Sequence, residues 1–219
     1  MTIIVKFNNN TVHIYCAFDE ILKLDNYNDI ICIYCSDNKI SSLPKLPNSL
    51  TKLWCAKNNL SKLPDLPDSM IELYCYDNNL SILPELPNSL TYLSCSNNNL
   101  SSLPELPNTL NILYCGNNYL SNLPILPNLL RILRCWNNNI SSLPEIPYSL
   151  NEINYRNNPV YQYIKQNFNG NIKFYCEFHT NMKRKFTNKI GNWILDCKYN
   201  PKYLYCRKRL MKEYEELYN

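Results

Sequence analysis

The stretch LPNSLTKLWCAKNNLSKLPDLPDSM, residues 46–70, recurs almost letter for letter every twenty residues. Each unit reads Leu-x-x-Leu-x-Cys-x-x-Asn-x-Leu, followed by Leu-Pro-x-Leu-Pro. A degenerate unit precedes the array around Ile14 to Ile21, and a partial unit follows from Leu150 with Tyr155 in the cysteine position. A fixed period of this kind indicates a repeat architecture in which each unit stacks on the next. The six full units begin at Ile30, Leu50, Met70, Leu90, Leu110 and Leu130.

Residues 52–56, Lys-Leu-Trp-Cys-Ala, are predicted to form a short strand in each unit. Side chains alternate along a strand, so Leu53 and Cys55 point to one side, and Lys52, Trp54 and Ala56 to the other. Strands of successive units would lie parallel, about 4.8 Å apart. A single unit buries too little apolar surface to fold alone, so neighbouring units must complete the core. The residues expected to fill that core in one unit are Leu50, Leu53, Cys55, Leu60, Leu63 and Leu66.

An asparagine follows each repeat cysteine by three residues, where the chain is expected to turn inward after the strand. An amide at this place can satisfy backbone groups that an apolar side chain could not. The two prolines of each unit lack an N–H and fix φ, so the return segment should be extended and polyproline-like, not helical. We therefore predict a structural ladder made of Cys35, Cys55, Cys75, Cys95, Cys115 and Cys135 with Asn38, Asn58, Asn78, Asn98, Asn118 and Asn138.

These repeated cores, which cover residues 30–160, resemble the leucine-rich repeat. The twenty-residue length with Leu-Pro-x-Leu-Pro is most like the leucine-rich-repeat proteins of giant DNA viruses, and is similar to the LPX-type repeats of bacterial effectors. One departure is that cysteine stands where the family usually has leucine. The resemblance implies a right-handed repeat solenoid of the α/β type dominated by β structure. Its parallel sheet would form the concave face, its convex side would be extended, and a helical cap would end it.

Charge divides the chain into two parts. Residues 161–219 hold 12 Lys and Arg against five Asp and Glu, and residues 1–160 hold ten against 13. We predict four segments: an N-terminal cap with a degenerate repeat (1–29), the repeat array (30–160), a C-terminal cap strand region (161–183) and a basic helical tail (184–219). The strand is favoured by the alternation of Ile172, Phe174, Cys176 and Phe178.

The eleven cysteines suggest three interpretations, and we favour small apolar plugs in the core. Neighbouring Cα atoms about 4.8 Å apart are within bridging range, but parallel Cβ vectors and a reducing compartment count against a disulfide ladder. Thiols twenty residues apart would form a line, not a tetrahedral metal site. Cys32 and Cys35 match a Cys-x-x-Cys motif but should face opposite sides of a strand. A zinc site at Cys176, His179, Cys197 and Cys206 is a further alternative, although no metal or cofactor is predicted.

Catalysis finds little support in the sequence. His13 and His179 lie near opposite ends, and three glycines could hardly build a phosphate-binding loop. Ubiquitin-ligase effectors with LPX repeats carry a Cys-x-Asp motif in a large helical domain. Cys35-Ser36-Asp37 and Cys75-Tyr76-Asp77 match those letters but sit in the repeat core, and the 59 residues after the array are too few for such a domain. We predict a protein that is not an enzyme.

The outward side of the strands varies from unit to unit and is rich in Trp, Tyr and Arg, the residues enriched at binding hot spots. The alternative is that these aromatics only shield the sheet by cross-strand packing. We expect a monomeric protein-interaction module that binds an unknown partner protein, one of the host if the chain is viral. The candidate partner-binding residues are Tyr34, Trp54, Tyr74, Tyr76, Tyr92, Tyr114, Arg134, Trp136 and Arg156.

Location and alternative functions follow from the ends of the chain. The start MTIIVKFNNN has no secretory signal, and no apolar run reaches 18 residues, so we expect an intracellular, cytoplasmic protein without a membrane span. One alternative function is a tether to nucleic acid or another acidic surface through the basic tail. Another is an effector or adaptor in a ubiquitin-ligase pathway.

Overall fold

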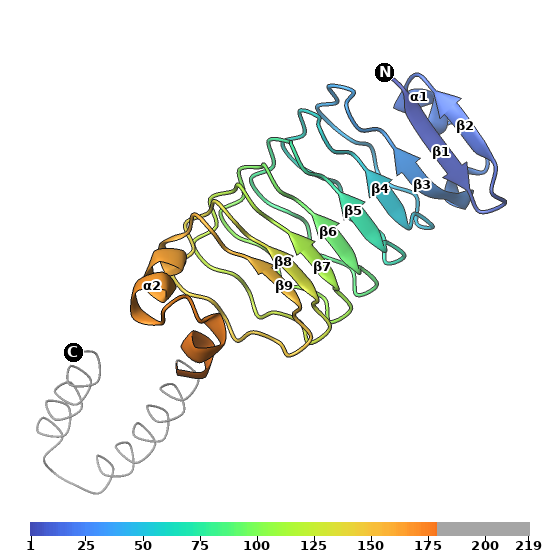
Figure 1. Cartoon of the computed structure of the whole chain (residues 1–219). Helices are drawn as coiled ribbons and strands as arrows, with labels where there is room; N and C mark the ends of the chain where they lie inside the picture. Colours follow the sequence, from blue (N-terminus) through green and yellow to red (C-terminus); the bar gives the residue numbers. More distant parts are fainter. Residues whose placement is uncertain (179–219) are drawn as a thin grey trace, which may run out of the picture. The chain divides into compact units, whose positions relative to one another are not determined.

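The computed structural model describes residues 1–178 and divides the chain into two units, Met1–Asn171 and Ile172–Asn219. In the first unit one nine-stranded sheet runs in the order β2-β1-β3-β4-β5-β6-β7-β8-β9 (Figure 1). Two short helices precede the array, α1 (Phe18–Ile21) and the 3-10 helix η1 (Tyr27–Asp29), and α2 (Pro159–Asn167) follows it. The strands are β1 (Ile3–Phe7), β2 (Val12–Tyr15), β3 (Ile30–Tyr34), β4 (Lys52–Trp54), β5 (Glu72–Tyr74), β6 (Tyr92–Ser94), β7 (Ile112–Tyr114), β8 (Ile132–Arg134) and β9 (Glu152–Asn154).

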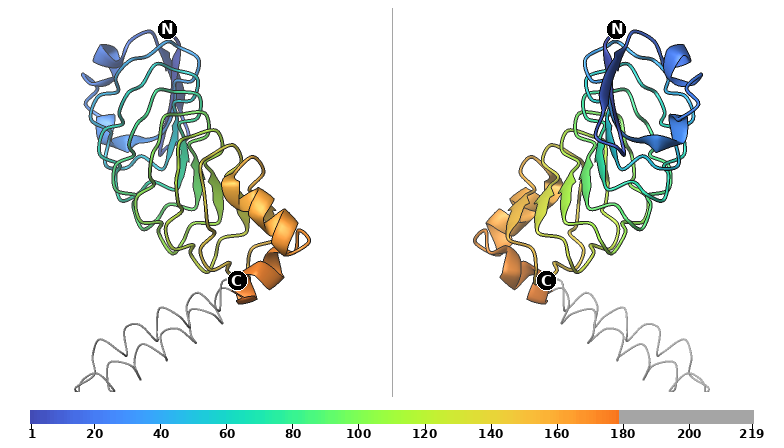
Figure 2. Two further views of the ribbon diagram at one scale, coloured as in Figure 1. Left: turned by 90° about the vertical axis from the view of Figure 1, so that its left-hand side faces the viewer. Right: turned by 90° about the vertical axis from the view of Figure 1, so that its right-hand side faces the viewer.

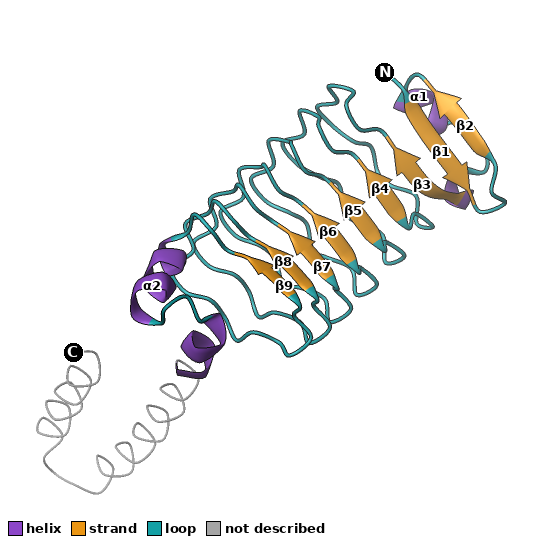
Figure 3. Cartoon of the chain, viewed as in Figure 1, coloured by secondary structure: helices purple, strands orange, loops and turns teal. Residues whose placement is uncertain are grey.

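Strands β3 to β9 are parallel and in strict register, so equivalent residues of successive coils lie side by side. Ile33 pairs with Leu53, Leu53 with Leu73, and the same position continues to Ile153. Figure 3 shows one strand per coil, each followed by a long stretch without regular structure. The parallel repeat solenoid predicted from the sequence is therefore confirmed.

The core lies between the strands and the return segments of the coils (Figure 2). Leu50, Leu53, Cys55 and Leu60 are fully buried, and Leu63 is 8% exposed. Leu66, expected in the same core, is only half-buried, because it lies in the return segment where one side of the chain faces solvent. The Leu-Pro segments form neither helix nor strand, as their prolines predicted.

The inward turn after each strand uses a left-handed backbone. Lys57, Asp77 and Asn97 have φ values of 54°, 54° and 56°, and each directly precedes a ladder asparagine. Asn and Asp tolerate this conformation better than most side chains, because their short polar groups can bond locally. The equivalent residues Asp37, Asn117, Asn137 and Asn157 have φ between 53° and 58°. The stacked turns thus repeat one left-handed geometry, and six of the seven residues there are Asn or Asp, with Lys57 the exception.

The prediction of a degenerate repeat around Ile14 to Ile21 was wrong. The first residues form an antiparallel hairpin, in which β1 pairs with β2 on one side and with β3 on the other. The Asn8-Asn9-Asn10-Thr11 turn reverses the chain: the N–H of Phe7 donates to the carbonyl of Thr11 at 3.0 Å, and Asn10 has a φ of 67°. Ile3, Val5 and Phe7 are buried, so the hairpin covers the first core layer of the array.

The predicted strand region at 161–183 was also wrong. Helix α2 begins at Pro159, whose fixed φ suits the first turn of a helix, and residues 172–178 are helical as well. Val160 and Ile164, four residues apart on one helix face, are fully buried and cap the last coil. A helix satisfies its own backbone groups, whereas a terminal strand depends on a neighbour. The remainder of that region and the predicted tail at 184–219 lie outside the described residues.

Candidate functional site

The sheet has one side turned away from the core, which we call the sheet face. It presents two residues from each coil, one on either side of the buried leucine of the strand. The first column is Cys32, Lys52, Glu72, Tyr92, Ile112, Ile132 and Glu152, and the second is Tyr34, Trp54, Tyr74, Ser94, Tyr114, Arg134 and Asn154. A third column, two residues further on, contains Tyr76, Trp136 and Arg156.

Five aromatic rings form an unbroken series across strands β3 to β7, which we call the aromatic row. The ring centroids of Tyr34 and Trp54 are 5.4 Å apart, and those of Trp54 and Tyr74 are 4.4 Å apart. Tyr74 stacks on Tyr92 at 4.4 Å, and Tyr92 meets the edge of Tyr114 at 5.7 Å. Such ring pairs are worth about 0.5–1.5 kcal/mol each beyond area burial, so the row is held rigidly.

The row passes over a gap in the second column. Ser94 is too short to continue the stack from Tyr74, and Tyr92 of the first column fills the space between Tyr74 and Tyr114. Ser94 is consequently only 5% exposed, although it belongs to the outward side of its strand. Burial raises the pKa of Tyr92, and burial with the neighbouring Glu72 carboxyl raises the pKa of Tyr74. Both phenols are therefore neutral donors at physiological pH.

Charged pairs flank the aromatic row. The Lys52 Nζ lies 2.7 Å from Glu72 Oε1, and the Arg134 Nε lies 2.7 Å from Glu152 Oε1. These hydrogen bonds raise the pKa of Lys52 and of Arg134. The guanidinium carbon of Arg134 also lies 4.9 Å from the centre of the Tyr114 ring, where a cation is attracted to the π face. Arg134 therefore continues the row beyond its last aromatic ring.

The structure brings six of the nine predicted binding residues into one contiguous series, from Tyr34 through Tyr114 to Arg134. Tyr76, Trp136 and Arg156 lie in the third column. Trp136 packs so closely over Gly116 that a β-carbon there would lie 2.5 Å from the indole Nε1. Ala56, expected on the open side, is likewise buried, and the equivalent residue of the next coil is Tyr76. Small residues in this column thus accommodate large ones from the next coil.

Sequence reasoning missed several residues of the sheet face. In the first column Ile112 pairs with Tyr92 and Ile132 pairs with Ile112, and the twenty-residue period could have identified both. Ile4 and Ile14 were missed because the hairpin was not foreseen: Ile14 pairs with Ile4, and Ile4 with Tyr34. Ile14 is 69% exposed, so apolar side chains continue past the row onto the hairpin.

The six predicted ladder cysteines lie in the core, each with no exposed surface. Burial raises the pKa of the Cys35, Cys95 and Cys135 thiols to about 12, and raises those of Cys55, Cys75 and Cys115 as well. All nine cysteines among the described residues are free thiols. The six ladder thiols therefore remain protonated at neutral pH and make poor nucleophiles.

The ladder asparagines connect successive coils. The Asn98 side-chain NH2 donates to the carbonyls of Cys75 (3.0 Å), Cys95 (3.1 Å) and Ser96 (3.2 Å). Its Oδ1 accepts the N–H of Leu80 at 3.0 Å. Asn58, Asn78, Asn118, Asn138 and Asn158 make equivalent bonds, whereas Asn38 at the first coil bonds to Thr2 and Ser36. These residues stabilise the stack and are not available as a site.

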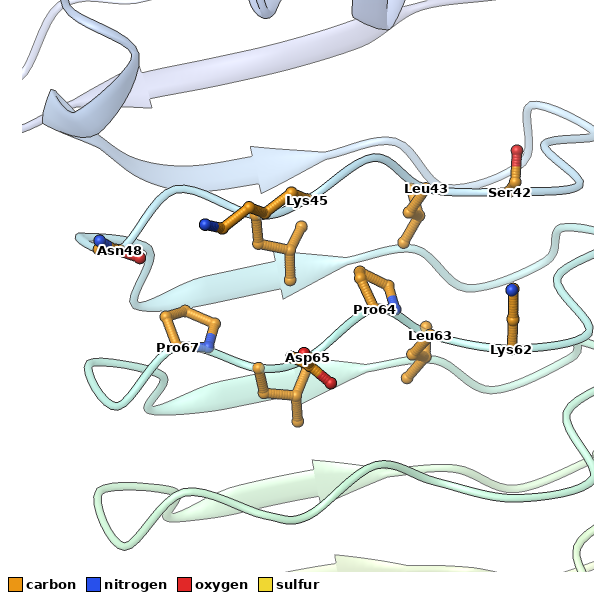
Figure 4. A pocket seen from close by; sticks show the side chains of 11 residues that line it. Ser42, Leu43, Lys45, Asn48, Lys62, Leu63, Pro64, Asp65 and Pro67 are labelled. Atoms are coloured by element: carbon orange, nitrogen blue, oxygen red, sulfur yellow. The ribbon is translucent and has the colours of Figure 1, made fainter.

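Shallow grooves lie on the opposite side of the coils, between successive Leu-Pro segments. The one in Figure 4 has a volume of about 620 Å³ and is lined by Leu43, Leu63 and Pro64, with Lys45 and Asp65 beside them. A similar groove recurs between the segments around Pro104 and Pro124. Its recurrence reflects the repeat itself, whereas the sheet face differs from coil to coil.

Neither a metal site nor a membrane span is found in residues 1–178. Those residues contain no group of three or more His, Cys, Asp or Glu placed to hold a metal ion. None of their helices is long and apolar enough to cross a membrane. The alternative zinc site depends on His179, Cys197 and Cys206, which lie outside the described part of the chain.

The parallel sheet, the asparagine ladder and the twenty-residue coils define a leucine-rich-repeat solenoid. Among solved structures, the chain is similar to YopM from Yersinia enterocolitica, with 40% sequence identity and a TM-score of 0.60 over 60% of this chain and 29% of that one. It is also similar to the leucine-rich-repeat domain of a Shigella effector, with 34% identity and a TM-score of 0.60 over 64% of each chain. The chain spans less than two thirds of both. No family model and no curated protein sequence matches it.

Proposed function

We propose that this chain is a protein-interaction module that binds a partner protein through the sheet face and performs no chemistry of its own. The aromatic row is the observation that carries the proposal. Five rings in continuous contact lie on the solvent side of the array, and Trp54 is 39% exposed. The similarity to bacterial leucine-rich-repeat effectors supports a binding role.

Rigidity favours this surface as a binding site. Rings that already pack against their neighbours lose little further side-chain entropy when a partner docks. Trp, Tyr and Arg are also the residues that most often dominate binding energy. The aromatic row presents Trp and Tyr on the parallel strands β3 to β7, and Arg134 follows on β8.

The core thiols argue against a thiol-based enzyme. Cys35 and Cys75 supply the Cys-x-Asp letters, yet both are fully buried and burial raises the pKa of each. A ligase mechanism requires an accessible thiolate that can take up a thioester. We expect no thioester adduct to form when the chain is incubated with charged ubiquitin-conjugating enzyme.

The test is capture of partners from cytoplasm by the full chain, compared with variants on opposite sides of the coil. Trp54→Ala and Trp136→Ala should each weaken binding of a captured partner by about 2 kcal/mol or more, as expected of hot-spot residues. Ile125→Ala is the matched control, because Ile125 is an apolar side chain 88% exposed on the Leu-Pro side. Loss of capture with Ile125→Ala but not with Trp54→Ala would show that the partner binds the Leu-Pro side, and our proposal of the sheet face would be wrong.

The basic tail supports a second candidate, a tether to an acidic surface. Residues 161–219 carry 12 basic and five acidic side chains. Truncation after Lys183 should abolish any salt-sensitive binding to heparin or nucleic acid. Undiminished binding by the truncated chain would place the anion-binding surface elsewhere. We also propose a cytoplasmic location, and a host protein as partner if the chain is of viral origin.

A further inference from the structure

We propose that the partner element bound by the sheet face is an acidic amphipathic α-helix, which lies across strands β3 to β7 along the aromatic row. This inference rests on the proposed function and adds the secondary structure and the charge of the ligand. It is carried by the direction of the row, by the pairing of the strands beneath it and by the charges on the two sides of the coil.

The row has the dimensions of a short helix. It crosses five strands, hence four spacings of about 4.8 Å, or about 19 Å in total. At a rise of 1.5 Å per residue, a helix of about 13 residues has that length. One helical turn advances about 5.4 Å, close to one strand spacing, so apolar residues at i, i+4, i+7 and i+11 would meet successive rings.

The backbone beneath the row favours a helix over an extended peptide. Strands β4, β5, β6 and β7 each pair with a neighbour on both sides, so they offer no free edge to an added strand. An extended peptide laid on the rings would press its N–H and C=O groups against apolar surface without partners. A helix satisfies these groups internally and presents only side chains.

Charge separates the two sides of the coil. The sheet face and its third column carry Lys6, Lys52, Arg134 and Arg156 against Glu72 and Glu152. Glu72 pairs with Lys52 and Glu152 with Arg134, so Lys6 and Arg156, at the two ends, supply the excess positive charge. The opposite side is acidic at the middle position of the Leu-Pro-x-Leu-Pro motif, where one basic residue, Lys45, compares with four acidic ones, Asp65, Glu85, Glu105 and Glu145. An acidic ligand is therefore attracted to the sheet face and repelled from the grooves on the other side.

The hairpin allows a longer contact. Ile4 and Ile14 continue the position of Tyr34 over two more strands, and Ile14 is largely exposed. Lys6 lies in the first column on the same hairpin. A helix that extends past Tyr34 would find apolar contacts and a positive charge there, without meeting an acidic residue of the sheet face.

The test uses two peptide display libraries panned against the full chain. One library is a 14-residue helix with Leu, Ile or Phe at i, i+4, i+7 and i+11 and random polar positions, and the other consists of random 14-residue peptides containing a central proline. We expect enrichment from the helical library, with Glu and Asp predominating at the polar positions. Enriched peptides should gain helicity on binding, measured by circular dichroism.

Variants locate the peptides and separate the two hypotheses. Trp54→Ala and Tyr114→Ala should each weaken an enriched peptide at least about tenfold, whereas Ile125→Ala should not, with melting temperatures measured for every variant. Enrichment that depends on Trp54 but yields extended or basic peptides would overturn the helix inference and keep the sheet face. Enriched peptides whose binding is unchanged by Trp54→Ala and Tyr114→Ala would overturn both the sheet-face proposal and the helix inference. No enrichment from the helical library would overturn the helix inference.

Discussion

The two sides of the strands differ in how much their residues vary from one coil to the next. On the inner side, Leu53, Cys55 and Asn58 recur in every coil with almost no change, and the outer side places Trp, Ser or Arg at one and the same position. Inner residues contact their own equivalents one coil away, so a change in one coil must suit both neighbours. Outer residues also contact their equivalents, as Trp54 and Tyr74 do, but they have solvent on their other side, so side chains of different size can occupy the position. Regularity therefore marks the residues that stack the coils, and variation marks the candidate site.

The largest expected effect concerns the thiols of the inner side at alkaline pH. Their pKa values are raised in the folded chain, to about 12 for Cys95, so their stabilising contribution is complete below the unfolded pKa near 9. Above that pH the unfolded chain loses thiol protons that the folded chain retains. The free energy of unfolding should then fall by about 1.4 kcal/mol per pH unit for each buried thiol, until the folded pKa is reached.

Urea denaturation between pH 7 and pH 10.5 measures this loss. The six ladder thiols should reduce the unfolding free energy by several kcal/mol at pH 10, compared with pH 8. The matched control is Cys95→Ala with Cys115→Ala, which removes two of the six and should make the decline about one third shallower. Unfolding free energies that do not change with pH would show that the thiols are not buried as described.

A second prediction concerns the asparagine ladder. Asn98→Ala leaves the buried Leu80 N–H without an acceptor, and it removes one hydrogen bond from each of three carbonyls. Those carbonyls keep their bonds from Asn78, Asn118 and the Asp77 N–H. We expect a loss of about 3 kcal/mol in unfolding free energy, because an unsatisfied buried N–H costs about 1–3 kcal/mol and each further lost hydrogen bond about 0.5–1.5 kcal/mol. The adjacent Asn99→Ala, on an exposed side chain, should cost little. Equal losses for the two variants would contradict the ladder.

The twenty-residue period predicted the parallel sheet, the buried cysteine position and the inward turn, because each depends on contacts between equivalent residues. It did not predict the hairpin at Ile3–Tyr15, where no repeat exists. The hairpin nevertheless had a local signal, since alternating Ile3, Val5 and Phe7 precede an Asn-rich turn. For α2 the signal was Asn158-Pro159 with Val160 and Ile164 four residues apart.

The candidate site was predictable only as a set of residues. The alternation of side chains identified Tyr34, Trp54 and Tyr74 as outward, but not that Tyr92 would lean over Ser94 and join the row. Whether a side chain packs over the neighbouring column depends on the size of the residues on the adjacent strands, and the alternation along one strand does not contain that information. The same limit applies to Ala56 and Gly116, which are buried on the open side.

A third prediction compares two substitutions at one cysteine. Cys95→Ser places a hydroxyl in a fully buried apolar site and should cost about 1–3 kcal/mol in unfolding free energy. Cys95→Ala leaves only a small cavity and should cost about 1 kcal/mol. Reductant and chelator should leave the melting temperature unchanged. A drop of many degrees with either reagent would mean that the thiols act through bridges or metal and not through packing.

The smallest expected effect tests the outer side alone. Gly116→Ala adds a β-carbon that would lie 2.5 Å from the Trp136 indole, so the ring must move. Trp136 is only half-buried and can swing toward solvent, so the loss in unfolding free energy should stay below about 1 kcal/mol. In a background with Trp54→Phe and Trp193→Phe, the fluorescence of Trp136 should shift to longer wavelength as its exposure rises. Ser96→Ala, in the same column one coil earlier, should leave the spectrum unchanged. A shift of similar size with both variants would show that Trp136 does not pack on Gly116, and the third column would then present its aromatic residues independently of the coils that precede them.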